Sequence, residues 1–182
     1  KKWQVSWNGT GEWKNLNSSS YQLNNLALHD FDGDGSTDIF KAASGKWSVS
    51  YGGTTRWTYL NTSSYKIHQF RFGDFDGNGT TDIMRLESPY CSKRSRYARR
   101  CTARKTRAKV SWGGTGSWRT LGTYSGKVYL STLAVGDFDG DGADDLLETT
   151  GSSWYVSWGG STNFEYRKNS SYRVNQIRLA DF

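Results

Sequence analysis

An acidic motif of nine residues that recurs along the chain constrains the fold more than any other feature of the sequence. The string Asp-Phe-Asp-Gly-Asp-Gly begins at Asp30 and again at Asp137, and a copy with Asn in the fifth position begins at Asp74. A fourth copy starts at Asp181, and the four starts lie 44, 63 and 44 residues apart. A repeat of this length predicts one supersecondary unit per copy, packed against its neighbours.

A second motif runs in the same register and predicts strands. Val-Ser precedes an aromatic residue at Trp7, Tyr51, Trp112 and Trp158, and six residues later stand Trp13, Trp57, Trp118 and Phe164. Residues 47–51 alternate apolar and polar side chains, Gly52-Gly53 turns the chain, and residues 57–60 suit a further strand. Four strands in about 44 residues is the size of one propeller blade. We therefore predict an all-β β-propeller of four-stranded blades, with three complete blades and partial first and last blades.

The composition agrees with a folded β protein. The chain has 182 residues, of which 9 are Trp, 11 Tyr and 8 Phe, and this aromatic content excludes intrinsic disorder. The formal net charge of +7 comes from one segment, since nine basic residues and no acidic residue lie between Lys93 and Lys109. Without that segment the chain carries 15 basic and 17 acidic residues, so its surface is not basic throughout.

The acidic loop has the donor chemistry of a calcium site. Asp30, Asp32, Asp34 and Asp38 occupy positions 1, 3, 5 and 9, and such crowded carboxylates repel one another unless a cation neutralises them. Hard oxygen donors without His or Cys suit Ca²⁺ and suit Zn²⁺ poorly. An EF-hand requires Glu at position 12, where Lys41 and Arg85 stand in the first two copies and Glu148 in the third. It also requires flanking helices, whereas strand-like residues flank all three loops.

The loop and the strands around it resemble the FG-GAP/VCBS repeat of integrin α-subunit propellers, which also occurs in secreted bacterial proteins and in a group of fungal seven-bladed lectins. The resemblance implies one Ca²⁺ per complete blade, between its first two strands, and three sites in all. The implied ligands are Asp30, Asp32, Asp34 and Asp38; Asp74, Asp76, Asn78 and Asp82; and Asp137, Asp139, Asp141 and Asp145, with backbone carbonyls of Ser36, Thr80 and Ala143. Because Asn78 removes one charge, we expect the second site to bind more weakly.

Residues 1–182 are predicted to form a single propeller or part of one. Three complete blades with partial blades at both ends leave three alternatives open: a piece of a longer chain, two copies that complete one ring, or a small four-bladed ring. The interval of 63 residues contains an insertion, which we place at residues 88–107 within the second-to-third repeat.

The insertion holds both cysteines of the chain and a cluster of basic residues. We predict a Cys91–Cys101 disulfide, since calcium loops of this kind belong mostly to oxidising compartments, and we expect a secreted protein. The enclosed loop is either a solvated surface loop, a site of proteolytic processing at Arg99-Arg100, or a contact for a polyanion. The residues predicted for a polyanion contact are Arg94, Arg96, Arg99, Arg100 and Arg104.

The function predicted from these features is non-catalytic carbohydrate binding. His29 and His68 are the only histidines, and no nucleophile–base pair or phosphate-binding loop is recognisable. Aromatic side chains at equivalent blade positions can stack on the C–H faces of sugars, as the resemblance to the fungal lectins also implies. The candidates are Trp13, Trp57, Trp118, Tyr51, Trp112 and Trp158, for each of which packing between blades is the competing explanation. The alternative function is an extracellular adhesion or protein-interaction propeller that contacts a protein or acidic polysaccharide through the basic insertion.

Overall fold

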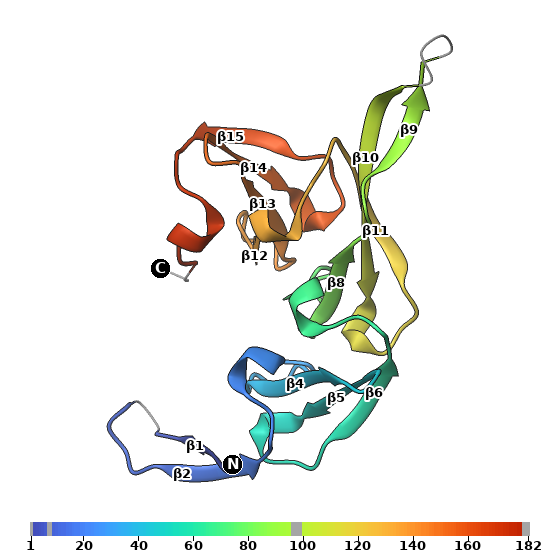
Figure 1. The fold of residues 1–182 in the computed structure, drawn as a ribbon. Coiled ribbons are helices and arrows are strands. Elements are labelled where there is room, and N and C mark those ends of the chain that lie inside the picture. The colour runs from blue at the N-terminus through green and yellow to red at the C-terminus, as the bar shows by residue number, and fades with distance from the viewer. Residues whose placement is uncertain (1, 7–8, 96–99, 180–182) are drawn as a thin grey trace. The chain divides into compact units, whose positions relative to one another are not determined.

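The structure is a computed structural model that describes residues 2–6, 9–95 and 100–179. This part of the chain is built from antiparallel strands joined by loops and short 3-10 turns, which confirms the all-β prediction (Figure 1). The chain divides into two compact units, Lys1–His68 and Gln69–Phe182, and each is described by itself. A single propeller over residues 1–182 stays a prediction.

The first unit contains a two-stranded sheet and a complete four-stranded sheet. Strands β1 (Lys2–Val5) and β2 (Lys14–Ser18) pair with each other, as expected for the last two strands of a partial blade. The first sheet has the strand order β3 (Leu26–His29), β4 (Asp38–Ala43), β5 (Lys46–Ser50) and β6 (Thr58–Thr62). Neighbours in space are neighbours in sequence, so the sheet is a simple meander.

The second unit contains two more sheets of the same kind. The second sheet has the order β7 (Arg71–Gly73), β8 (Asp82–Leu86), β10 (Cys101–Ser111) and β11 (Arg119–Ser125), and β9 (Tyr90–Arg94) pairs with β10. The third sheet has the order β12 (Leu133–Gly136), β13 (Asp145–Thr149), β14 (Ser153–Ser157) and β15 (Glu165–Asn169). Each repeat therefore forms one antiparallel sheet, with four strands in the first and third repeats and five in the second, where β9 of the insertion adds a strand.

Short 3-10 turns stand at equivalent places in the repeats. One set precedes the first strand of a sheet: η2 (Leu23–Asn25), η4 (Ile67–Gln69) and η6 (Leu130–Thr132). A further turn, η8 (Val174–Gln176), follows the third sheet. The other set follows the third strand: η3 (Tyr51–Gly53), η5 (Trp112–Gly114) and η7 (Trp158–Gly160). The predicted Gly-Gly turn is confirmed, but Tyr51, expected as the end of a strand, begins η3 instead.

Glycine is required at the Gly-Gly turn for two physical reasons. Gly53 has φ = +68°, a region that L-residues rarely adopt. A Cβ atom at Gly53 would lie 3.1 Å from Ile39 Cδ1 and 3.3 Å from Leu16 Cδ1, so the backbone packs directly on apolar side chains. The Gly-Gly turn after β5 therefore packs directly on Leu16 of strand β2.

The core of the second unit lies between its two sheets. Met84, Val110 and Tyr124 from the second sheet and Leu133 and Leu146 from the third are almost fully buried in one cluster. The hydroxyl of Tyr124 donates a hydrogen bond to the Gly160 carbonyl, which ties strand β11 to η7 of the next repeat. Apolar burial and one buried polar contact therefore join consecutive repeats in this unit.

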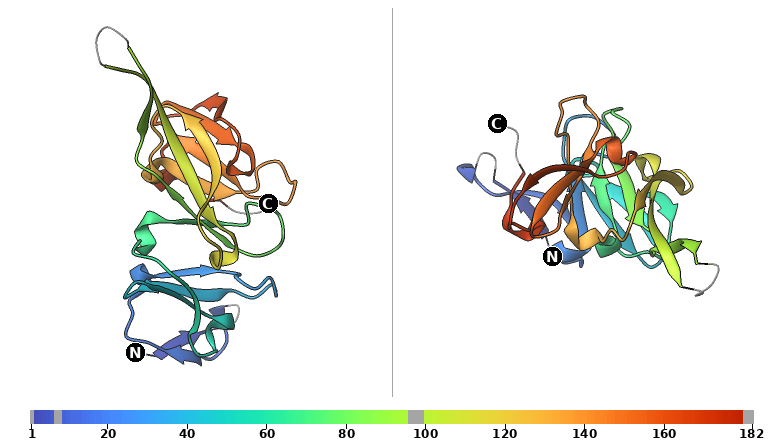
Figure 2. Two further views of the ribbon diagram at one scale, coloured as in Figure 1. Left: turned by 90° about the vertical axis from the view of Figure 1, so that its right-hand side faces the viewer. Right: turned by 90° about the horizontal axis from the view of Figure 1, so that it is seen from above.

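The insertion extends the sheet as a β-hairpin. Strand β10 is 11 residues long; its inner half pairs with β8 and β11 and its outer half pairs with β9. Figures 1 and 2 show β9 and the outer half of β10 projecting beyond the rest of the second sheet. Among the described residues, no helix is long and apolar enough to cross a membrane.

Candidate metal centres

The three acidic loops each join the first two strands of a complete sheet, and each gathers three carboxylates. Loop 1 (residues 30–38) precedes β4, loop 2 (74–82) precedes β8, and loop 3 (137–145) precedes β13. In each loop the carboxylates of positions 1, 3 and 9 place one oxygen apiece within 4.8 Å of one another. These triads are Asp30, Asp32 and Asp38; Asp74, Asp76 and Asp82; and Asp137, Asp139 and Asp145.

The position-9 aspartate is buried and holds the loop together. Asp38 is fully buried; its Oδ2 accepts a hydrogen bond from the Phe31 N–H at 2.8 Å, and its Oδ1 accepts one from the Gly52 N–H at 2.7 Å. Asp82 and Asp145 repeat both bonds in their own repeats, the first from the position-2 residue and the second from the first glycine of the Gly-Gly turn. One carboxylate therefore links the acidic loop to the turn after the third strand.

The position-1 aspartate shapes the tip of each loop. The two oxygens of Asp30 accept hydrogen bonds from the Gly33 N–H at 2.7 Å and the Gly35 N–H at 2.8 Å. Asp137 accepts the equivalent bonds from Gly140 and Gly142, and the bond from Gly142 is the main reason that the pKa of Asp137 is lowered. Hydrogen bonding to the backbone thus keeps this carboxylate charged and aimed inward.

The burial of the position-9 carboxylate leaves a negative charge that needs a cation. In the part of the chain that the structure describes, the ion pairs join Glu87 and Glu165 to arginines, and no loop aspartate takes part. Burial raises the pKa of Asp82 to about 6, and the N–H groups of Gly113 and Phe75 offset only part of this rise. A hard cation held by oxygen donors supplies the missing positive charge, so the residues present fit a bound Ca²⁺.

The position-5 residues lie outside the carboxylate triads, although their side-chain oxygens accept loop N–H groups as those of Asp32 and Asp139 do. Asp34 Oδ1 accepts a hydrogen bond from the Ser36 N–H at 2.7 Å, Asn78 Oδ1 one from the Thr80 N–H at 2.8 Å, and Asp141 Oδ1 one from the Ala143 N–H at 2.8 Å. Each of these oxygens therefore accepts a hydrogen bond from the backbone two residues later in its own loop. Coordination by Asp34, Asn78 and Asp141, and by the carbonyls of Ser36, Thr80 and Ala143, stays a prediction.

The comparisons with known proteins bear on the same loops. Residues 30–84 match the family model of the FG-GAP-like repeat. The match begins at the first aspartate of loop 1 and ends in β8, so it spans two of the three triads. It confirms the family resemblance expected from the motif, and the all-β sheets agree with an FG-GAP β-propeller type of fold. The comparisons with curated proteins and with solved structures returned no match.

Loops 2 and 3 are bonded directly to each other through Asp144, a residue that the sequence analysis did not single out. Asp144 Oδ2 accepts a hydrogen bond from the Asp74 N–H at 2.7 Å, and the Asp144 N–H donates to the Asp74 carbonyl at 2.6 Å. Threonine, Thr37 or Thr81, occupies this position in the other two loops. The additional carboxylate in the third copy was the signal available in the sequence.

In the first two copies of the repeat, the position-12 residue contacts an aromatic ring. Lys41 Nζ lies 4.1 Å from the centroid of the Trp57 ring, and the guanidinium carbon of Arg85 lies 4.9 Å from that of Trp118. These are cation–π contacts, whereas the third copy has Glu148 at this position. The exclusion of an EF-hand therefore agrees with the strands that flank each loop.

The six aromatic candidates for carbohydrate binding differ in exposure. The side chain of Trp13 is 69% exposed. The other five, Trp57, Trp118, Tyr51, Trp112 and Trp158, are partly buried, and the guanidinium of Arg167 lies 4.6 Å from the centre of the Trp158 ring. One face of three of these rings is thus covered by a cation.

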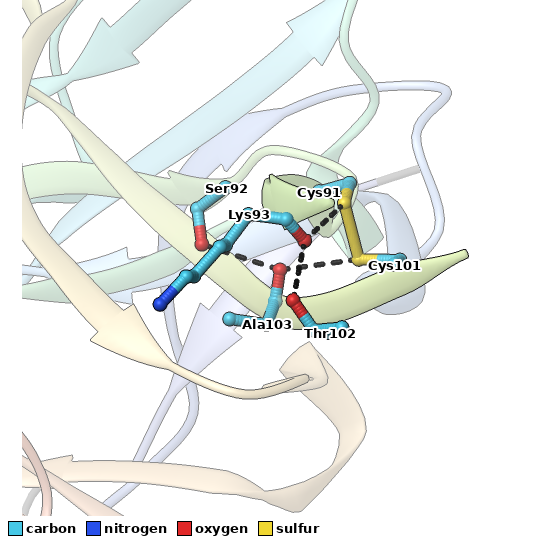
Figure 3. Close-up of a disulfide and its surroundings, with 6 residues drawn as sticks. All are labelled: Cys91, Ser92, Lys93, Cys101, Thr102 and Ala103. Carbon is cyan, nitrogen blue, oxygen red and sulfur yellow. Dashed lines mark hydrogen bonds between the residues drawn. A yellow bond between two sulfur atoms is a disulfide. The ribbon is translucent and has the colours of Figure 1, made fainter. Parts of the chain in front are cut away.

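The disulfide prediction is confirmed. Cys91 and Cys101 are bonded, with their Cα atoms 5.7 Å apart, across β9 and β10 (Figure 3). Of the basic residues predicted for a polyanion contact, Arg94, Arg100 and Arg104 are exposed on this hairpin. Arg96 and Arg99 lie outside the described residues.

Proposed function

We propose that this protein is a non-catalytic, calcium-binding propeller module that recognises carbohydrate outside the cell. The observation that supports calcium binding is the recurrence of one triad geometry in three loops, each with a buried carboxylate that lacks a basic partner. Ca²⁺ takes six to eight oxygen ligands, so the remaining positions go to the position-5 side chain, the position-7 carbonyl and water. The ion stabilises each loop-bearing sheet because it removes repulsion among three carboxylates.

Calcium titration of single-loop variants tests this part of the proposal. Position 3 is the right place for the substitution, because Asp32, Asp76 and Asp139 are exposed, whereas position 9 also holds the loop in place. We expect isothermal calorimetry to count three sites in the native protein and two in each of the single variants Asp32→Asn, Asp76→Asn and Asp139→Asn. Glu12→Gln, at an exposed acid outside the loops, is the matched control and keeps three. Unchanged stoichiometry in all three loop variants contradicts the assignment.

The weaker second site has a test of its own. Asn78 is a neutral amide where the other loops have aspartate, so loop 2 carries one negative charge fewer than loops 1 and 3. Its Oδ1 accepts hydrogen bonds from the N–H and the hydroxyl of Thr80. We expect Asn78→Asp to tighten calcium binding at loop 2, and Asp141→Asn to weaken loop 3 in the matched reverse change. A tighter second site in the native protein overturns this ranking.

The proposed carbohydrate binding is supported by the exposed and half-exposed aromatic side chains at equivalent positions of the repeat. Sugars stack their C–H faces on such rings, and a single stacked ring is worth about 0.5–1.5 kcal/mol. A glycan array tests the class, and Trp13→Ala should weaken the binding of any glycan found there by about twofold to twelvefold. Tyr129→Ser removes an exposed aromatic ring outside the candidate set and serves as the control. An array with no glycan signal rejects carbohydrate recognition and leaves the calcium proposal untouched.

A second candidate function is adhesion or protein interaction through the basic hairpin. The observation that favours it is the projection of β9 and the outer half of β10 beyond the sheet, with exposed basic side chains on both strands. The disulfide across the hairpin supports secretion, because such bonds persist in oxidising compartments. A salt-sensitive partner combined with no binding to a panel of simple neutral sugars favours this candidate.

A further inference from the structure

The hairpin β9–β10 carries a concentrated positive charge. Residues 88–136 contain eleven basic residues and no acidic residue. Five of the basic residues are exposed on the described part of the hairpin, and we call them the hairpin cations: Lys93, Arg94, Arg100, Arg104 and Lys105. They carry about five charges in roughly a dozen residues.

At the base of the hairpin a basic side chain is paired with a carboxylate, unlike the hairpin cations farther out. Arg107 forms an ion pair with Glu87 at 3.1 Å, and its guanidinium stacks 5.1 Å from the centroid of the Tyr90 ring. Over residues 2–6, 9–95 and 100–179, the ion pairs involve only Arg85, Arg107 and Arg167 as cations. None of the hairpin cations is therefore paired with a carboxylate there.

The hairpin is held in shape by covalent and hydrogen bonds. The Cys91–Cys101 disulfide joins the strands, and next to it the Ser92 hydroxyl donates to the Ala103 carbonyl at 3.2 Å and the Thr102 hydroxyl to the Lys93 carbonyl at 3.1 Å (Figure 3). Such cross-links restrain the backbone that carries the charged side chains, so little backbone ordering entropy is lost on binding.

The cations occupy both faces of the hairpin. Arg104 is directly opposite Cys91, and Lys105 is directly opposite Tyr90. Directly opposed residues share a face and successive residues alternate, so Arg104 and Lys105 lie on opposite faces. A flat anionic surface would meet only one face, whereas a flexible linear polyanion can contact both.

The neighbouring side chains favour a polysaccharide over a nucleic acid or a membrane. Binding of single-stranded nucleic acid relies on free aromatic rings, and Tyr90, the aromatic residue of the described hairpin, is covered by Arg107. Membrane binding relies on exposed apolar anchors, and the exposed large hydrophobic side chains of the described chain all lie outside residues 90–105. Arginine pairs well with planar or tetrahedral oxyanions such as carboxylate and sulfate.

We propose that the hairpin β9–β10 is a binding site for a linear acidic polysaccharide, whose sulfate or carboxylate groups pair with the hairpin cations. The inference rests on the second candidate function, since it names the partner class for the hairpin. It is independent of the aromatic candidates and of the calcium loops, because the hairpin cations belong to neither.

The test measures binding of the whole chain to immobilised heparin as a sulfated probe and to polygalacturonate as a carboxylated probe. The hairpin variant is Arg100→Ser/Arg104→Ser/Lys105→Ser, and the control variant is Lys14→Ser/Lys46→Ser/Arg56→Ser, which removes equal charge from exposed positions elsewhere. We expect the hairpin variant to lose at least about tenfold in affinity at 0.1 M salt and the control to stay within about twofold. The magnitude of the slope of log affinity against log salt concentration should fall by about 2, because three charges are removed and each contributes roughly 0.7–0.9 to the slope.

Several outcomes overturn the inference. Equal losses in both variants assign binding to net charge, and no loss in the hairpin variant assigns it to another surface. Tighter binding to duplex DNA or to anionic lipid vesicles than to either polysaccharide rejects the partner class. Loss of binding in excess chelator assigns it to the acidic loops instead. The same hairpin variant should still bind three calcium ions, so failure of the hairpin site and failure of the calcium proposal are distinguished by one calorimetric titration.

Discussion

Removal of the Asp144 carboxylate tests whether consecutive acidic loops are mechanically coupled. Asp144 accepts the Asp74 N–H at 2.7 Å, and Asp74 is the position-1 residue of loop 2. Asp144→Ala leaves this half-buried N–H without its partner while the backbone bond from the Asp144 N–H to Asp74 remains. The substituted residue belongs to loop 3, but the group that loses its partner belongs to loop 2.

The expected loss of folding stability in Asp144→Ala follows from the strength of the hydrogen bond that is removed. A hydrogen bond to a charged group contributes about 1.5–3 kcal/mol, and burial, which raises the pKa of Asp144, shows that desolvation offsets part of it. We therefore expect about 1–2 kcal/mol of destabilisation. For a chain of this size that corresponds to a fall in melting temperature of roughly 2–8 °C. Asp144→Asn keeps an acceptor oxygen and should lose less than half as much.

The assay is thermal unfolding followed by tryptophan fluorescence, together with a calcium titration. Thr37→Ala, at the equivalent exposed position of loop 1, is the matched control and should change stability by less than about 0.5 kcal/mol. Calcium affinity should fall at loop 2 by about fivefold, equivalent to ~1 kcal/mol, and stay unchanged at loop 1. The coupling argument is refuted if Asp144→Ala lowers the melting temperature no more than Thr37→Ala does. It is also refuted if Asp144→Ala changes calcium affinity at loop 3 only.

Three further predictions concern stability. Excess chelator should lower the melting temperature by several degrees, because crowded carboxylates then repel one another, and an unchanged melting curve argues against bound calcium. Burial raises the pKa of Glu148, so ionisation of this side chain costs more free energy in the folded state than in the unfolded state. Glu148→Gln removes that cost and should therefore raise the melting temperature at pH 7. Well below pH 4.5 the side chain is protonated in both the folded and the unfolded state, and the substitution should leave the melting temperature unchanged. An equal effect at both pH values contradicts that reasoning. Gly53→Ala should cost about 1–3 kcal/mol through its positive φ and its contact with Leu16, whereas Gly45→Ala, with positive φ but open space, should cost less in a denaturant titration.

The fold was predictable because its information is local and repeated. The 44-residue spacing, the alternation over residues 47–51 and the Gly-Gly turn each specify a strand or a turn within one repeat. Each of these patterns is weak by itself, but together they predict the fold strongly because they recur in the same register in every repeat. The boundaries were less certain, because the aromatic residue after Val-Ser can end a strand or begin a turn. The hydrogen bond from the Gly52 N–H to Asp38, in the acidic loop of the same repeat, favours the turn.

The candidate site was predictable in its residue types and less so in its geometry. The carboxylates at positions 1, 3 and 9 could be named from spacing alone, but spacing did not show that position 5 turns back onto the loop. It also did not show that position 9 binds the Gly52 amide of a turn 14 residues away. That bond depends on how β4 and β5 pair, which a linear pattern does not contain.

By itself, the sequence determined the repeat, the strand content, the oxygen-rich loops and the cysteine pair, because each of these depends on residues close together in the chain or on a fixed period. Only the tertiary structure decided that Asp144 bridges two loops, that Lys41 and Arg85 cover tryptophan rings, and that the insertion continues strand β10 as a charged hairpin. These contacts join residues from different strands or repeats. Their existence depends on sheet register and on the packing of one sheet against the next, and both are properties of the folded chain.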